Sequence, residues 1–244
     1  MAAQNVDVVL VIDASDSMKP CFDGVRKHLN SLLQPLQGNA ARVRFGLVAL
    51  NALREQGQIG YHLKMLGGAS WDKFYATQPP AGLFTEKTAE VLQALQGIHL
   101  QGNEHTLMAL DFALDHPFGV VHNTRRVVVL LSDETIETGI EGLAACQKIP
   151  SLVEKLNQRR VKLFMALPVS DAAEQLEAAN GCEFEAVQGG GGLAGVDFSR
   201  LFQQMGKSIS VSATQSSGEA AYQRALFGQD RWESVNTNGW STAD

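Results

Sequence analysis

Four short runs of nearly continuous apolar residues recur along the chain. They cover residues 8–12, 43–50, 126–131 and 161–167. Runs of this length that are rich in β-branched residues and show little polar alternation are typical of parallel strands covered on both faces. Residues 61–66 predict a further, antiparallel strand, and residues 182–187 predict a final edge strand.

Between these runs, apolar residues recur at steps of three and four, which predicts amphipathic helices. The helices are expected at residues 25–36 after Pro20, 89–98 opened by Thr85, 107–114, 143–156 with an interruption or bend at Pro150, 172–179, and 198–205. Strands that alternate with helices in this way predict βαβ units with right-handed crossovers. We therefore expect an α/β fold of the Rossmann-like kind: a doubly wound, mostly parallel central sheet with one antiparallel edge strand and helices on both faces.

One domain can account for most of the 244 residues, of which 45% are hydrophobic. We expect that domain to span residues 1–211. Residues 212–244 change in character to small and polar residues with scattered aromatics, and we expect a C-terminal tail that is partly flexible or docks. The large apolar residues of the tail either pack back on the domain or contact a partner; they are Tyr222, Leu226, Phe227, Trp232 and Trp240.

The charge balance excludes some partners. Twenty basic and 26 acidic residues give a formal charge of −6, which argues against an electrostatic grip on nucleic acid or on an anionic membrane. No apolar run approaches the length of about 18 residues that a membrane span requires. The three cysteines are widely spaced and odd in number, so a disulfide framework is not expected, and the first residues do not resemble a signal peptide. We expect a cytoplasmic protein.

Candidate chemistry gathers where the predicted strands end. Asp13, Ser15 and Ser17 follow the first strand at alternate positions, and Ser132, Asp133 and Glu134 follow the strand at 126–131. Loops at the carboxyl ends of parallel strands converge on one crevice. Carboxylate and hydroxyl oxygens are the ligands of Mg²⁺, Mn²⁺ or Ca²⁺ and not of soft metals. The sequence therefore predicts a divalent cation site, with Mg²⁺ favoured.

These motifs resemble those of the von Willebrand factor type A (VWA) domain family. The segment Asp13-x-Ser15-x-Ser17 is similar to the family's metal-ion-dependent adhesion site (MIDAS), and Asp133 is similar to the distal aspartate of that site. Residues 102–106, before a helix of small residues, resemble the middle loop of the family. The resemblance extends over roughly residues 6–209. It implies that Asp13, Ser15, Ser17, Asp133 and either Glu104 or Thr106 hold the metal.

The chain departs from the family pattern at two positions. Glu104 stands where the family carries threonine, with Thr106 two residues later, and Glu134 stands where many relatives carry glycine. If Glu104 is a ligand, the carboxylates of Asp13, Glu104 and Asp133 carry three negative charges against the two positive charges of the cation. Each repulsion between two unit charges is worth about 4 kcal/mol at 4 Å with an effective dielectric constant near 20. Such a site is expected to bind an external acid poorly. Our hypothesis is that the metal is chiefly structural or faces a neutral or basic partner.

The resemblance implies a metal-dependent protein–protein interaction module and not an enzyme. The partner is expected to dock on the metal-bearing loops, with the tail as a second candidate contact. The system it implies, a stress system built around an AAA+ ATPase or a kinase and phosphatase, is analogy with bacterial cytosolic relatives.

Other readings of the same residues are weaker. A metal-dependent hydrolase or phosphotransfer enzyme on the same sheet is the alternative function. A phosphoryl-accepting Asp13 would need a second aspartate where Ser15 stands, and no G-x-S-x-G elbow is present. The glycine run at 189–192 lacks the Lys-Ser/Thr of a phosphate loop and is expected to be a flexible connection, and His105 is expected to be a solvated loop residue.

Overall fold

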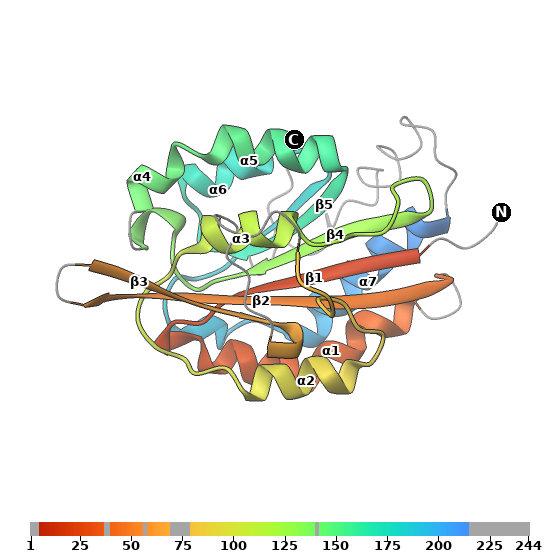
Figure 1. Ribbon diagram of the computed structural model, residues 1–244, viewed down its shortest axis with the longest axis horizontal. Coiled ribbons are helices and arrows are strands. Elements are labelled where there is room, and N and C mark those ends of the chain that lie inside the picture. The colour runs from red at the N-terminus through yellow and green to blue at the C-terminus, as the bar shows by residue number, and fades with distance from the viewer. Residues whose placement is uncertain (1–4, 37–39, 56–57, 69–78, 140–141, 215–244) are drawn as a thin grey trace.

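The computed structural model describes residues 5–36, 40–55, 58–68, 79–139 and 142–214 (Figure 1). The predictions made for the aromatic residues of the tail lie outside these residues. Within them, no helix combines the length and the hydropathy needed to span a bilayer.

A six-stranded sheet forms the centre of the described part of the chain. Its strands are β1 (Asn5–Asp13), β2 (Arg42–Glu55), β3 (Gln58–Met65), β4 (Thr124–Leu131), β5 (Val161–Leu167) and β6 (Cys182–Ala186), in the spatial order β3-β2-β1-β4-β5-β6. β3 pairs antiparallel with β2 and every other pairing is parallel. The predicted fold class is confirmed, including the antiparallel edge strand.

Helices cover both faces of this sheet (Figure 1). The longer ones are α1 (Lys19–Leu33), α2 (Thr88–Gln96), α3 (Thr106–Leu114), α5 (Ile149–Arg159), α6 (Asp171–Glu177) and α7 (Phe198–Thr214), with a short α4 (Gly142–Cys146). One-turn 3₁₀ segments are η1 (Asp16–Met18), η2 (Gln34–Leu36), η3 (Leu66–Gly68), η4 (Ile136–Thr138) and η5 (Gly191–Leu193). α1, α2 and α7 pack on one face, and α3, α5 and α6 pack on the other.

The alternation of side chains along β1 builds a separate core on each face. Val8 and Leu10 pack with the helices α1, α2 and α7, whereas Val9 and Val11 pack with α3, α5 and α6. All four are fully buried. A strand that is covered on both faces has no solvent side, which explains its unbroken apolar sequence.

The helix predicted at 143–156 is two helices. α4 ends at Cys146 and α5 begins at Ile149, with Pro150 in its first turn. Proline lacks a backbone N–H and is tolerated only where that donor would be unpaired, so it starts a helix here instead of bending one.

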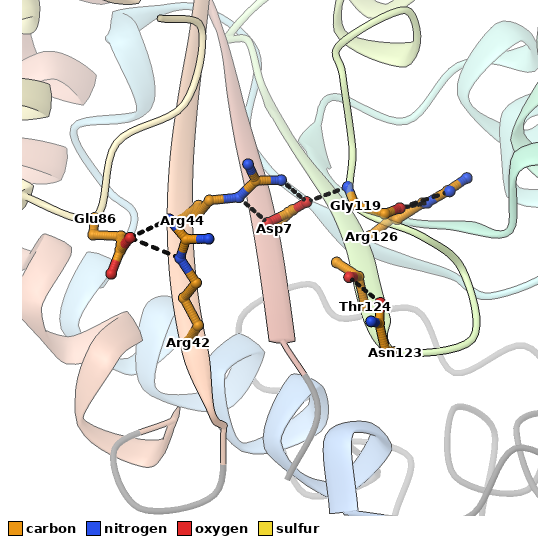
Figure 2. Close-up of polar contacts among 8 residues, drawn as sticks. All are labelled: Asp7, Arg42, Arg44, Glu86, Gly119, Asn123, Thr124 and Arg126. Carbon is orange, nitrogen blue, oxygen red and sulfur yellow. Dashed lines mark hydrogen bonds and ion pairs between the residues drawn. The ribbon is translucent and has the colours of Figure 1, made fainter.

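A polar cluster joins the amino-terminal parts of β1, β2 and β4 (Figure 2). The buried carboxylate of Asp7 accepts two hydrogen bonds from Arg44, at 2.7 and 2.6 Å, and one from the Gly119 amide at 2.7 Å. Arg126 donates to the Gly119 carbonyl oxygen at 2.9 and 2.7 Å. The cluster joins β1, β2 and β4 to the loop before β4.

The β2–β3 hairpin projects beyond the carboxyl end of β1 (Figure 1). Asp13, the last residue of β1, pairs with Leu50, and β2 continues to Glu55. In the projecting part, Ala52 and Asn103 exchange backbone hydrogen bonds of 2.8 and 2.9 Å. The hairpin thereby fixes the loop before α3 beside the end of β1.

Candidate metal centre

The loop after β1 turns around the side chain of Asp13. Its Oδ1 accepts a hydrogen bond from the Ser15 amide at 2.8 Å, and its Oδ2 accepts from the hydroxyls of Ser15 and Ser132, both at 3.1 Å. Asp13, Ser15 and Ser132 are all buried. This aspartate is therefore oriented from two loops, one after β1 and one after β4.

Ser17 connects the same two loops at the surface. Its hydroxyl lies 3.2 Å from that of Ser15 and donates to Asp133 Oδ1 at 2.9 Å. Asp13, Ser15, Ser17 and Asp133 thus form a continuous chain of oxygen contacts. The structure brings together the first and third of the loops that the sequence predicted to meet.

The glycine-rich segment after β6 donates two backbone hydrogen bonds to Asp133. The Gly192 amide donates to Asp133 Oδ2 at 2.7 Å, and the Gly190 amide donates to the Asp133 carbonyl oxygen at 2.7 Å. Gly192 has a φ of 61°, and a Cβ atom there would lie 2.0 Å from the Ser17 carbonyl oxygen. The interpretation of this run as a flexible connection is wrong, because the run orders a site residue. Its positive φ and close backbone approach require glycine.

The loop before α3 brings Glu104 to the site. Burial raises the pKa of its half-buried carboxyl, as do the neighbouring charges of Glu134 and Asp133, while a hydrogen bond with Ser15 acts in the opposite direction. Thr106 is buried at the first position of α3. Glu104 therefore lies close enough to the site carboxylates to interact with them electrostatically, and Thr106 occupies the first position of the helix that follows.

His105, between these two residues, is buried and not solvated as expected. Its ring packs edge to face against Tyr61 of β3, with ring centroids 5.4 Å apart. The projecting β2–β3 hairpin covers it, and the sequence alone does not reveal that the hairpin extends this far.

Two carboxyl groups lie buried at this site without a counter-ion from the described residues. Burial, and after it the charge of Glu104, raises the pKa of Asp13 to about 7. Within the described ranges, neither Asp13 nor Asp133 forms an ion pair with lysine, arginine or histidine. A buried carboxylate is costly unless a cation or several donors compensate it.

This donor set fits a hard divalent cation. The groups that converge are carboxylate and hydroxyl oxygens, which Mg²⁺ and Ca²⁺ prefer. The nearby Cys21 thiol is fully buried, and its pKa is raised by burial and by Asp13 and Asp133, so it stays protonated and does not offer a soft ligand. Among the described residues, no three His, Cys, Asp or Glu side chains are grouped to hold a metal by themselves. The serine hydroxyls would have to complete the ligand set.

Solved structures with the same fold are distant in sequence. The SpRpn10 VWA domain superposes with a TM-score of 0.57 at 13% identity, over 84% of this chain and 98% of that one. A von Willebrand factor type A protein from Catenulispora acidiphila gives a TM-score of 0.52 at 14% identity, over 88% of this chain and 43% of that one. At this level of identity the similarity shows the fold alone. No curated protein matches the sequence.

The family assignment rests on the sequence itself. The model of the von Willebrand factor type A domain matches residues 7–183, a stretch that contains every candidate residue from Asp13 to Asp133. The sheet order and the convergence of the loops agree with that match. The chain belongs to the von Willebrand factor type A domain family.

Proposed function

We propose that the protein is a metal-dependent protein–protein interaction module. Asp13, Ser15 and Ser17 would hold the cation from the first loop, and Asp133 would act from the third, partly through water. The single observation that carries the proposal is the 2.9 Å contact between Ser17 and Asp133, which closes two distant oxygen-rich loops on each other. A bound Mg²⁺ would supply a positive charge that neutralises the buried carboxylates and an electrophilic centre for a partner's oxygen.

The residues around the cation set the chemistry of the partner. Asp16 is exposed, and Glu104 and Glu134 are partly exposed beside the two buried aspartates. Five carboxyl groups outnumber the two charges of a divalent cation, so the face stays negative after the metal binds. We infer that the metal is chiefly structural or meets a neutral or basic surface, and that an acidic partner is disfavoured.

Titration calorimetry with Mg²⁺ and Mn²⁺ tests which residue completes the site. Wild type is compared with Glu104→Ala and with Thr106→Ala, and circular dichroism checks that each variant is folded. If Glu104 is the ligand, Glu104→Ala weakens metal binding by at least about tenfold and Thr106→Ala leaves it unchanged. The reverse pattern assigns Thr106. Unchanged binding in both variants would remove the loop before α3 from the site.

The partner itself is a separate question. Affinity purification from cell extract, with magnesium and with a chelator, is expected to recover a partner only in the presence of the metal. The proposed system, around an AAA+ ATPase or a kinase and phosphatase, rests on the family resemblance alone. The proposed cytoplasmic location rests on the three widely spaced cysteines, which are all free thiols. Partners that bind equally well in chelator would contradict a metal-dependent interface.

The alternative on the same fold is a metal-dependent hydrolase or phosphotransfer enzyme. We propose that the protein is not an enzyme, and an assay with a generic phosphoester tests this directly. The expected result is no metal-stimulated turnover above that of Asp13→Ala. Turnover that requires both Mg²⁺ and Asp13 would favour the enzyme.

A further inference from the structure

A hollow of about 600 Å³ lies at one edge of the sheet, between the end of β6, the glycine-rich segment and the first turns of α7. Residues of all three elements line it. Gly190, Gly191 and Gly195 are among the lining residues, and a Cβ atom at any of these positions would meet nothing within 4 Å. The proposed metal-dependent docking does not use this hollow.

One lining residue, Glu185, has a buried carboxyl group with an oxygen that accepts no hydrogen bond from the described residues. Glu185 of β6 is only 7% exposed, and its Oε2 has no hydrogen-bond partner among the described residues. Buried polar atoms are almost always paired, so the orphaned oxygen of a residue that lines a cavity requires an explanation. Burial raises the pKa of Glu185 to about 8.

The other charged groups near Glu185 do not satisfy it. Arg200 of α7 also lines the hollow and lowers the pKa of Glu185, but this effect is smaller than that of burial, and no hydrogen bond between the two is found in the described chain. Asp197 lines the hollow as well, and its Oδ1 accepts the Arg200 amide at 3.0 Å. On the same strand, Glu183 pairs with the buried Lys162. With Glu185 ionised, the lining therefore carries two negative charges against one positive charge.

We propose that this hollow binds a cationic nitrogen, an ammonium or guanidinium group, through the carboxylate of Glu185. A buried carboxylate gains most from a cation that also donates hydrogen bonds, because one group then supplies both the missing partner and the missing charge. The cation comes either from a small amine or from a lysine or arginine side chain of a partner. Both sources present the same chemistry to Glu185.

Binding of a cation here releases a proton. Because the pKa of Glu185 is about 8, the carboxyl group is largely protonated at neutral pH and must ionise to form the ion pair. Affinity should therefore rise by roughly tenfold per pH unit up to about pH 8 and level off above it. A ligand that merely fills the hollow by apolar contact would show no such dependence.

The test uses two-dimensional NMR of the full chain, with n-butylammonium chloride and the peptide acetyl-Gly-Lys-Gly-amide as probes and n-butanol as the uncharged control. The amides of residues 186–191 and 195 should shift with either cation, and more strongly at high pH, but not with n-butanol. Shifts with both probes identify a site open to free amines, and shifts with the peptide alone identify a site for a partner's side chain. The absence of shifts with both probes across the pH range would overturn the proposal.

Matched variants assign the effect to Glu185. Glu185→Gln keeps the shape of the side chain and should weaken binding by at least about tenfold, because it removes a charge-assisted hydrogen bond. Asp197→Asn should retain binding within about threefold, because that carboxyl group is exposed and screened. Should Glu185→Gln fail to fold, calorimetry of the wild type in two buffers of different ionisation enthalpy still measures the proton release. Equal binding by Glu185→Gln, or no proton release, contradicts the proposal.

Discussion

Ser17 donates a 2.9 Å hydrogen bond to Asp133, a residue 116 positions later in the chain. Ser17 is exposed and Asp133 is fully buried, so the hydrogen bond connects a surface residue to a residue in the interior. The buried end is fixed by Gly192, whose amide holds the other carboxylate oxygen at 2.7 Å. The oxygen donors are therefore positioned by the fold before any ligand arrives.

Ser17→Ala should weaken Mg²⁺ binding by at least about tenfold while changing the free energy of unfolding by no more than about 1.5 kcal/mol. The hydroxyl is a proposed ligand, yet the side chain is exposed and adds little to the core. Calorimetry and urea denaturation measure the two quantities separately. Ser151→Ala, at an exposed serine of α5 whose hydroxyl contacts only the Lys148 carbonyl among the described residues, is the control and should change neither.

Gly192→Ala and Gly190→Ala form a matched pair that tests the close packing beneath Asp133. Both glycines have positive φ, 61° and 74°, so alanine is strained at both positions. Only at Gly192 would the new Cβ also collide with the Ser17 carbonyl oxygen, at 2.0 Å. We expect Gly192→Ala to cost at least about 2 kcal/mol more than Gly190→Ala in urea denaturation and to reduce metal affinity. Equal costs would mean that the contact with Ser17 is relieved easily.

The stability of the metal-free protein should fall as pH rises. The pKa of Asp13 is about 7 in the folded chain and 3.8 in an ordinary aspartate, so the folded state holds this proton more tightly than the unfolded state. Its contribution is fully present below pH 3.8 and is lost as pH rises through 7, a change on the order of 4 kcal/mol. Urea denaturation in chelator between these pH values measures it.

Asp13→Asn is the control for this slope, because it removes the titrating group while keeping an acceptor for the Ser15 amide. The difference in unfolding free energy between wild type and Asp13→Asn isolates Asp13 from Glu185, whose raised pKa acts in the same direction. A difference that stays constant with pH would contradict the raised pKa of the buried Asp13 carboxyl group. Adding Mg²⁺ should stabilise the wild type more at higher pH, since the proton and the cation compete for the same oxygens.

The Asp7 cluster should be essential for stability and irrelevant to the metal. Asp7→Ala leaves Arg44 partly buried without its carboxylate and should cost about 3–5 kcal/mol in thermal or urea unfolding. Arg42→Ala breaks an ion pair with Glu86 in which both side chains are about half exposed, and it should cost less than about 1 kcal/mol. Asp7 lies near the start of β1 and Asp13 at its end, so any Asp7→Ala protein that folds should bind Mg²⁺ normally.

Most of the fold could be predicted because its signals are local. The buried parallel strands appear in the sequence as apolar runs, because helices cover both faces of β1 and β4. The division of residues 143–156 into two helices could not be predicted, because a proline can either bend a helix or stand in its first turn. In the structure α4 ends at Cys146, and Pro150 stands in the first turn of α5. The length of the β2–β3 hairpin could not be predicted, because Asn51, Arg54 and Glu55 interrupt the apolar run that marks the rest of β2.

The site could be predicted in part for the same reason. Asp13, Ser15, Ser17 and Asp133 follow strands, and strand ends converge by topology. The role of Gly192 could not be predicted, because a glycine run predicts backbone freedom but not which oxygen its amides will meet. The burial of His105 depends on Tyr61, a contact across 44 residues that no local pattern encodes.

Direct calorimetric titration of the wild-type protein with Mg²⁺, beside Asp13→Asn, tests most directly whether these loops form a metal centre. One ion per chain should bind to wild type, with release of protons below pH 7, and binding to Asp13→Asn should be at least about tenfold weaker. Failure of the folded wild type to bind Mg²⁺, Mn²⁺ or Ca²⁺, or equal binding by Asp13→Asn, would contradict the metal-dependent function proposed for this face.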